Sequence, residues 1–278
     1  MKTYELINQG SKFLKDKKIL SNRIDSEIIL SYILGISRER ILVDENYIQP
    51  EEVKKFKSLI LRRSKNEPIA YITKTKEFRS SDFFVDKNSL IPRPETELLI
   101  DPIISIFKGK KCLFLDVGIG TGCIIFSILR ELKNSTGVGI DKCEKTILNA
   151  KKNLINFDLQ NRAKLLHRSI SGIFNYKFDL IVSNPPYIIN REIKHLSEDI
   201  RRYEPRFALD GGNDGLDVIR KVIYKSKYIL KKNGILALEI GNGQHKKVLS
   251  ILKNNNFRLT RTVKDYKNNV RCIFSTLL

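Results

Sequence analysis

The stretch CLFLDVGIGTG at positions 112–122 decides the fold of this chain. Its first four residues are apolar and predict a buried strand, and the glycine-rich turn leads into an apolar helix over 123–132. Strand, glycine turn and helix in this order are typical of the nucleotide-binding opening of a doubly wound α/β sheet. The glycines let backbone N–H groups approach a ligand and leave room for the start of the helix.

A second predicted strand, 138–141, ends in the carboxylate of Asp141, 19 residues after Gly122. A carboxylate at this position can accept hydrogen bonds from both hydroxyls of a ribose. A dinucleotide fingerprint needs a glycine where the chain has Cys123, which argues against an NAD-dependent oxidoreductase. The pattern D-x-G-x-G-x-G over 116–122 instead resembles the S-adenosylmethionine loop of class I methyltransferases. There the turn borders the methionine part and the second-strand acid binds the ribose.

The quartet Asn184-Pro185-Pro186-Tyr187 follows an apolar strand predicted over 178–182. Both prolines lack an N–H, so they end the sheet ladder in a stiff turn. The turn carries a side-chain amide, free carbonyls and an aromatic ring, which suit a planar substrate nitrogen. If Asn184 and Pro185 accept its two N–H protons, the lone pair becomes localised and aims at a methyl group, while Tyr187 stacks on the plane. The alternative is a purely structural loop.

The remaining predicted elements alternate between helix and strand. They are helices 145–156 and 216–230, the second stopping at Asn233-Gly234, strands 164–168 and 235–240, and a closing β-hairpin of strands 257–262 and 270–275. Ligands of doubly wound sheets bind beyond the carboxyl ends of the strands, so Asp116, Asp141, the loop at Ser169-Ile170 and Asn184 are expected at one edge. The predicted fold is α/β, with a Rossmann-like, mostly parallel sheet.

The chain is predicted to divide into three parts. Residues 1–66 show amphipathic helical patterns and are expected to form a small α-helical bundle that positions a substrate. Residues 67–90 alternate between aromatic and polar side chains, which predicts a connecting β-hairpin. Residues 91–278 are expected to form the sheet domain, which carries all of the motifs described above.

Two further segments are expected to border the site. The sequence LIPRPETE at 90–97 enters the sheet domain in an extended form because of its prolines, and a paired Arg93 and Glu97 suit a wall of the active site. The polar stretch 188–212 is too long for a simple turn, so we expect a lid or a substrate loop.

Composition limits the classes of function. No segment has the length of a membrane span and the N-terminus lacks an apolar signal region, so a cytoplasmic location is expected. Four cysteines without a CxxC pair and three histidines argue against a structural zinc, a disulfide framework or a metal site. The net charge of +20 suggests a polyanionic partner such as RNA, whereas lysines scattered along the chain equally suit a biased genome composition.

These motifs together resemble the PrmC/HemK family, whose members methylate the glutamine amide of the Gly-Gly-Gln motif in class-1 peptide chain release factors. The resemblance covers nearly the whole chain. The segments that carry it are IPRPETE (91–97), SNPPYI (183–188), YEP (203–205) with Ala208 and Leu209, GNDGL (212–216), and LEIG (238–241) with Gln244.

The resemblance implies S-adenosyl-L-methionine as cofactor, S-adenosyl-L-homocysteine as product, no metal, and a release factor as the partner of a monomer that needs no stable nucleic-acid binding. The implied cofactor site is Gly118, Ile119, Gly120, Thr121, Gly122, Asp141, Ile170 and Asn184. The implied substrate site is Asn184, Pro185, Pro186, Tyr187, Arg93 and Glu97, with Asn184, Pro185 and Tyr187 as the catalytic group.

Two departures from the family pattern occur. Ser169-Ile170 stands where the family usually has an acidic residue followed by an aromatic one, and Tyr71-Ile72-Thr73-Lys74 stands where it has Tyr-Ile-x-Gly. A methyltransferase for exocyclic amines of RNA or DNA is the main alternative, since it shares the cofactor loop and the quartet. Such an enzyme flips its base and usually carries a target-reading domain, of which the sequence shows no sign. A non-catalytic RNA-binding protein would explain the charge but not the motifs.

Overall fold

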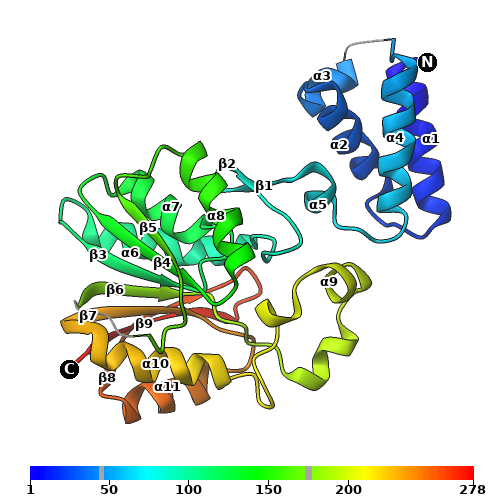
Figure 1. Ribbon diagram of the computed structural model, residues 1–278. Coiled ribbons are helices and arrows are strands. Elements are labelled where there is room, and N and C mark those ends of the chain that lie inside the picture. Colours follow the sequence, from blue (N-terminus) through cyan, green and yellow to red (C-terminus); the bar gives the residue numbers. More distant parts are fainter. Residues whose placement is uncertain (44–46, 173–176) are drawn as a thin grey trace. The chain divides into compact units, whose positions relative to one another are not determined.

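The computed structural model describes residues 1–43, 47–172 and 177–278. The chain divides into two compact units. The helical unit comprises residues 1–75 together with 197–203, and the sheet unit comprises residues 76–196 and 204–278. Figure 1 shows the helices of the first and the layered sheet of the second.

The helical unit is a bundle around an apolar core that includes Leu6, Ile29 and Phe56. A charged pair lies within it, since Arg63 Nε donates to Asp25 Oδ2 at 2.6 Å and both side chains are largely buried. Its helices are α1 (Thr3–Asp16), α2 (Asn22–Leu34), α3 (Arg38–Val43), α4 (Pro50–Arg63), α5 (Ile69–Thr73) and α9 (Glu198–Tyr203).

Helix α9 is distant in sequence from the rest of its unit. The Asn66 side-chain amide donates to Glu198 at 2.9 Å, and the Tyr203 hydroxyl donates to the Lys65 carbonyl at 2.8 Å. The predicted boundary at residue 66 was therefore wrong in two respects: the unit extends to Thr75 and includes residues 197–203. Long-range hydrogen bonds of this kind leave no periodic trace in the sequence.

The connecting segment is only partly the predicted hairpin. Strands β1 (Thr75–Phe78) and β2 (Ser81–Phe84) form a two-stranded sheet, but Ile69–Thr73 is helical rather than extended. Helix α5 ends at Lys74, which adopts φ 62°. The family pattern that the sequence resembles has glycine at this position, and glycine enters the left-handed region without the steric cost that lysine meets.

The sheet unit contains the predicted α/β sheet. Its seven strands follow the order β5-β4-β3-β6-β7-β9-β8, parallel except for β9, which runs antiparallel to both of its neighbours. The closing hairpin is therefore confirmed. The strands are β3 (Leu113–Val117), β4 (Thr136–Asp141), β5 (Ala163–His167), β6 (Phe178–Ser183), β7 (Leu230–Glu239), β8 (Phe257–Lys264) and β9 (Val270–Leu277).

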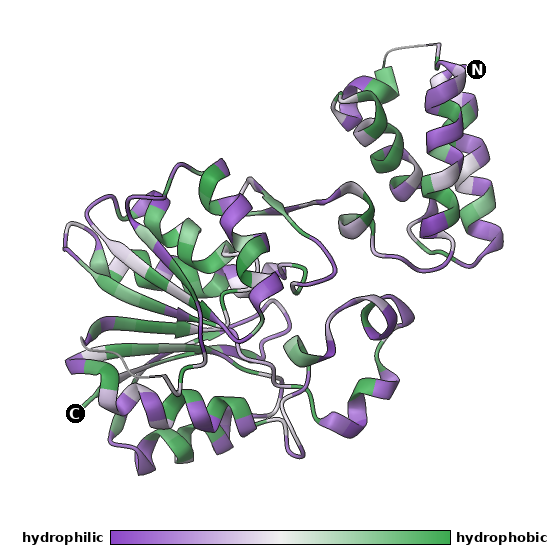
Figure 2. Cartoon of the chain, in the orientation of Figure 1, coloured by the Kyte–Doolittle hydropathy of each residue, from purple (hydrophilic) through white to green (hydrophobic). Residues whose placement is uncertain are grey.

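Helices cover both faces of this sheet (Figure 1). Helices α6 (Ile100–Phe107), α7 (Cys123–Glu131) and α8 (Glu144–Asn156) share one apolar cluster with Leu180, and α10 (Asp217–Ile229) and α11 (His245–Asn254) share another with Ile181. Neighbouring residues of a strand point to opposite faces, so β6 contributes side chains to both clusters. Figure 2 accordingly shows the strands as mainly hydrophobic. The described residues of this unit also form the short 3₁₀ helices η1 (Pro94–Leu99), η2 (Asn190–His195) and η3 (Arg206–Ala208).

The predicted helix stop at Asn233-Gly234 was wrong. Helix α10 ends at Ile229, and Leu230 already pairs with Phe178 in the sheet. The register then shifts before the next pair, and Asn233 takes φ 62° within this irregular part of β7. An Asn-Gly signal therefore marked a bulge rather than a helix end. Across residues 1–43, 47–172 and 177–278, no helix is both long and apolar enough to span a membrane.

Candidate active site

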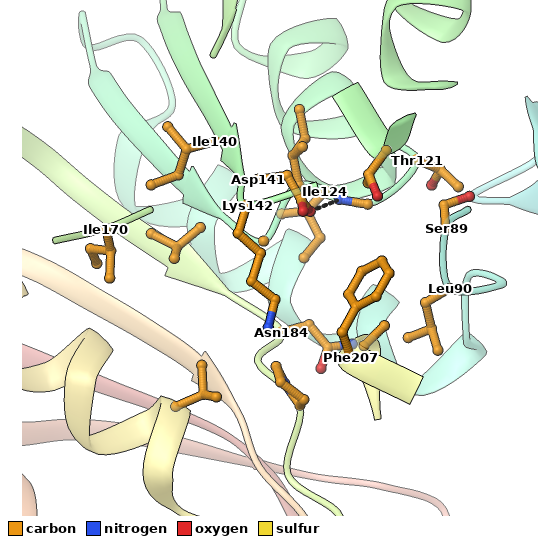
Figure 3. A pocket seen from close by; sticks show the side chains of 18 of the residues that line it. Ser89, Leu90, Thr121, Ile124, Ile140, Asp141, Lys142, Ile170, Asn184 and Phe207 are labelled. Carbon is orange, nitrogen blue, oxygen red and sulfur yellow. Dashed lines mark hydrogen bonds between the residues drawn. The ribbon is translucent and has the colours of Figure 1, made fainter. Parts of the chain in front are cut away.

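A cavity of about 240 Å³ lies at the carboxyl ends of β3, β4 and β6 (Figure 3). Its walls contain most of the residues proposed from the sequence: Arg93, Gly118, Ile119, Gly120, Thr121, Asp141, Ile170, Asn184 and Pro186. Four others, Glu97, Gly122, Pro185 and Tyr187, are not among its lining residues. The sheet edge thus brings the two main motifs to one site, as expected for a doubly wound sheet.

The glycine turn is shaped by its own backbone. The N–H groups of Gly118 and Ile119 both donate to the Ile140 carbonyl at 2.9 Å, which ties the turn to the neighbouring strand. Gly122 adopts φ 83°, and a Cβ there would lie 2.1 Å from the Phe126 ring. The absence of a side chain at Gly122 therefore lets the first turn of α7 pack closely against the glycine turn, and Gly122 does not face the cavity.

Asp141 lies at the end of β4 and is 8% exposed. Its Oδ1 accepts the Cys143 N–H at 2.9 Å, and its Oδ2 accepts the Gly120 N–H at 3.4 Å (Figure 3). Burial raises the pKa of this carboxyl, whereas the two backbone hydrogen bonds lower it. The carboxylate is thus fixed beside the glycine turn and borders the cavity.

Asp116 does not border the cavity, contrary to the prediction from the sequence. Val117 lines the cavity, and side chains alternate along a strand, so Asp116 points to the other face, beneath α7. There its Oδ2 accepts the Ile125 N–H at 3.2 Å. Complete burial raises the pKa of Asp116 to about 7.

One wall of the cavity comes from the segment after β2, where the sequence did not assign Ser89 to the site and the predicted wall segment begins at Leu90. Ser89 and Leu90 line the cavity, and helix α8 holds this segment in place. Thr146 Oγ1 donates to the Asn88 carbonyl at 2.7 Å, and the Asn149 amide donates to Ser89 Oγ at 3.0 Å. Polar residues on the buried face of α8 were the feature of the sequence that could have indicated this contact.

The cavity lining also contains a cation close to an aromatic ring. Lys142 Nζ lies 5.6 Å from the centroid of the Phe207 ring, and both residues line the cavity (Figure 3). Ile170 is buried and lines the cavity, so the departure at Ser169-Ile170 leaves an aliphatic surface in place of an aromatic one.

The quartet after β6 is held by a chain of hydrogen bonds. Asn184 Nδ2 donates to Thr96 Oγ1 at 3.0 Å, and Thr96 Oγ1 donates to Glu239 Oε2 at 2.6 Å. The Tyr187 hydroxyl donates to Glu239 Oε1 at 3.3 Å. Burial raises the pKa of Glu239 to about 7 and also raises that of Tyr187. Asn184 lines the cavity, whereas Pro185 is buried and Tyr187 half-buried.

Gln244 fixes the far side of the quartet. Its Oε1 accepts the Gly241 N–H at 2.8 Å, and its Nε2 donates to the carbonyls of Tyr187 at 3.0 Å and Gly215 at 3.1 Å. Each polar atom of this amide thus has a backbone partner.

The predicted pairing of Arg93 with Glu97 was wrong. Arg93 forms an ion pair with Glu204, whose other oxygen accepts the Ile91 N–H at 3.3 Å. Glu97 instead accepts the Arg79 N–H at 3.0 Å. Arg93 therefore lines the cavity and Glu97 fastens the β1–β2 turn, because the helical turn at η1 points the two side chains apart.

Comparison with known proteins agrees with this geometry. The chain is 36% identical to the release factor glutamine methyltransferase of Caulobacter vibrioides, over 94% of this chain and 91% of the relative. It is 35% identical to the enzyme of the same name from Clostridium acetobutylicum, over 99% and 98%. The chain belongs to the release factor glutamine methyltransferase family.

Two segments of this release factor glutamine methyltransferase family member match two different family models. Residues 5–73 match the family described as PrmC N-terminal domain, and residues 110–243 match the Eco57I restriction-modification methylase family. A methyltransferase from Pyrococcus furiosus has a similar fold, with a TM-score of 0.52, 17% identity, and coverage of 79% of this chain and 96% of that one. The sheet unit thus shares its fold with another methyltransferase, and the match to the PrmC N-terminal domain lies in the helical unit.

Proposed function

We propose that this protein transfers a methyl group from S-adenosyl-L-methionine to the side-chain amide nitrogen of the glutamine in the Gly-Gly-Gln motif of class-1 peptide chain release factors. The observation that carries this proposal is the Asn184 amide, whose Nδ2 is bound to Thr96 at 3.0 Å at the edge of the cavity. In the described part of the chain, no group donates to Asn184 Oδ1. The amide oxygen is therefore free to accept a substrate N–H.

The chain's own residues can prepare an amide nitrogen for attack. The lone pair of a glutamine amide is delocalised into its carbonyl, so it is a poor nucleophile. Asn184 Oδ1 and the Pro185 carbonyl would each accept one N–H of that amide, which localises the lone pair. The prolines hold both acceptors in a stiff turn, so most of the rate enhancement comes from positioning.

The cavity fits the cofactor. Asp141 offers carboxylate oxygens for ribose hydroxyls, the turn of Gly118–Gly122 offers backbone close to a ligand, and Ile170 offers an apolar surface. When bound, S-adenosyl-L-methionine supplies an electrophilic methyl group on its sulfonium. Transfer would form the nitrogen–carbon bond as the sulfur–carbon bond breaks, S-adenosyl-L-homocysteine would leave, and the surplus N–H proton would pass to water from the nitrogen held by Asn184 and Pro185.

One observation favours a second candidate, the methylation of an exocyclic amine in nucleic acid. The match to the Eco57I restriction-modification methylase family covers the glycine turn and the quartet. It does not cover residues 1–75 of the helical unit, where the match to the PrmC N-terminal domain over 5–73 instead favours a release factor. We assign substrate positioning to this unit.

Transfer of radiolabel decides between the candidates. The protein is incubated with methyl-labelled cofactor and, separately, with a release factor, with its Gly-Gly-Gln glutamine replaced by alanine, and with bulk RNA and DNA. Label in the release factor that disappears with the alanine variant supports the proposal. Label in nucleic acid without label in the release factor contradicts it.

A further inference from the structure

The hydrogen bonds behind Asn184 involve two buried residues that no part of the proposed mechanism has used. Thr96 is 2% exposed and Glu239 is 1% exposed, so bulk water does not compete for their hydrogen bonds. Thr96 Oγ1 lies 2.6 Å from Glu239 Oε2 and 3.0 Å from Asn184 Nδ2. It therefore links the carboxylate to the amide.

The number of hydrogen atoms available fixes which group donates and which accepts in the hydrogen bonds that join Asn184, Thr96 and Glu239. A hydroxyl carries one hydrogen, and an ionised carboxylate only accepts, so the Thr96 hydrogen must point to Glu239. Thr96 can then meet Asn184 only as an acceptor, which requires the Asn184 NH₂ to face Thr96. The amide oxygen of Asn184 is consequently turned away from Thr96, toward the cavity that Asn184 lines.

We infer that Thr96 and ionised Glu239 are positioning residues that set the orientation of the Asn184 amide, and that protonation of Glu239 reverses it. This inference rests on the proposed function. A protonated Glu239 can donate to Thr96, whose hydrogen then becomes free to point to Asn184. Flipping of the amide gives this hydrogen an acceptor in Asn184 Oδ1. The NH₂ group then faces the substrate N–H groups, where donor meets donor.

The surroundings of Glu239 place this switch in an accessible pH range. The pKa of Glu239 is raised to about 7, because burial raises it by more than the hydrogen bonds from Thr96 and Tyr187 and the charge of Arg271 lower it. The charged or titratable groups that act on this carboxyl or respond to it are Tyr187 after β6, Arg271 and Cys272 on β9, Glu95 on η1 and Cys123 on α7.

The first test replaces the linking hydroxyl. Thr96→Val removes the acceptor at nearly constant volume, and we expect kcat for release factor methylation to fall on the order of 10²-fold, with an unchanged Kd for S-adenosyl-L-methionine. Thr96→Ser keeps the hydroxyl and should restore kcat to within a few-fold of the wild-type value. A Thr96→Val enzyme with wild-type kcat contradicts the inference, as does a Thr96→Ser enzyme as slow as the valine variant.

The second test uses pH and does not depend on the folding of the valine variant. We expect kcat of the wild type to fall as pH decreases below about 7. Glu239→Gln can donate to Thr96 at every pH, so its kcat should be low and lack this acidic limb. An acidic limb that persists in Glu239→Gln overturns the inference alone. A wild type that methylates no release factor at any pH instead overturns the proposed function, and the inference with it.

Discussion

The two ends of the cavity are built in different ways. The glycine end, formed by Gly118–Gly122 and Asp141, is held by backbone groups of two adjacent strands and the turn between them. The asparagine end is formed by Asn184–Tyr187 with Thr96 and Glu239, and hydrogen bonds between side chains hold it. Asn184 and Thr96 are 88 residues apart in the sequence, and Thr96 and Glu239 are 143 residues apart. Local backbone hydrogen bonds thus fix the geometry of the glycine end, whereas long-range side-chain contacts fix that of the asparagine end.

The difference suggests a division of labour. A site whose shape is fixed by backbone hydrogen bonds suits a ligand that must only be held, since this shape survives the loss of any one side chain. A site whose acceptors must point in one direction needs a network that excludes other orientations. Substitutions at the glycine end should therefore change affinity, and those at the asparagine end should change turnover.

Asn184→Ala should show the largest effect. It removes the substrate acceptor and leaves the glycine end intact, so we expect kcat to fall by roughly 10³-fold or more while the Kd for S-adenosyl-L-methionine stays within a few-fold. Methyl transfer and cofactor titration measure the two quantities. Asn254→Ala, at the exposed end of α11, is the control and should change neither. Retained transfer in Asn184→Ala would remove the basis of the amide mechanism.

Asp141→Ala tests the glycine end through the same two quantities, kcat and the Kd for S-adenosyl-L-methionine. Loss of this carboxylate should weaken cofactor binding by roughly 10²-fold, since hydrogen bonds to a charged group contribute about 1.5–3 kcal/mol each. At saturating cofactor, kcat should remain close to the wild-type value. Asp82, exposed on β2, provides a matched Asp→Ala control. A loss of kcat without a change in Kd would contradict the division of labour.

Gly122→Ala measures how strongly the backbone at the glycine end is constrained. Its φ of 83° and the 2.1 Å approach to Phe126 should together lower the free energy of unfolding by about 2–4 kcal/mol. Gly109 has φ 75° with no atom within 4 Å of the added Cβ, so Gly109→Ala reports the backbone cost alone, about 1–2 kcal/mol. Equal losses in the two variants would mean that Phe126 moves away freely.

The smallest predicted effect concerns the pH dependence of stability at the asparagine end. Burial raises the pKa of Glu239 from its ordinary 4.5 to about 7, so the folded state retains a proton that the unfolded chain releases in this window. The free energy of unfolding should therefore fall as pH rises from about 4.5 to 7. Glu239→Gln should reduce this fall by on the order of 1–2 kcal/mol.

Urea unfolding of wild type and Glu239→Gln at pH values across this window measures the change. Asp116, whose pKa burial also raises to about 7, should leave part of the slope in place. An identical slope in both proteins would show that Glu239 is ionised throughout. Activity and stability should thus change in opposite directions with pH at the asparagine end.

The sequence predicted the two ends unequally, for the same physical reason. Hydrophobic periodicity and turn chemistry are local, so the strand, the glycine turn and Asp141 could be placed from neighbouring residues. The Thr96–Asn184 contact joins segments 88 residues apart, and nothing in either segment specifies the other. The false Arg93–Glu97 pair arose in the same way, because sequence proximity was taken for contact while Arg93 actually pairs with Glu204.

The most direct test of the central claim is to map the methyl group. Release factor incubated with the protein and S-adenosyl-L-methionine is digested and sequenced by tandem mass spectrometry, with the Asn184→Ala variant in parallel. The account predicts one methyl group on the side-chain nitrogen of the Gly-Gly-Gln glutamine with wild type and none with the variant. A methyl group on another residue, or on that glutamine with both proteins, would contradict it.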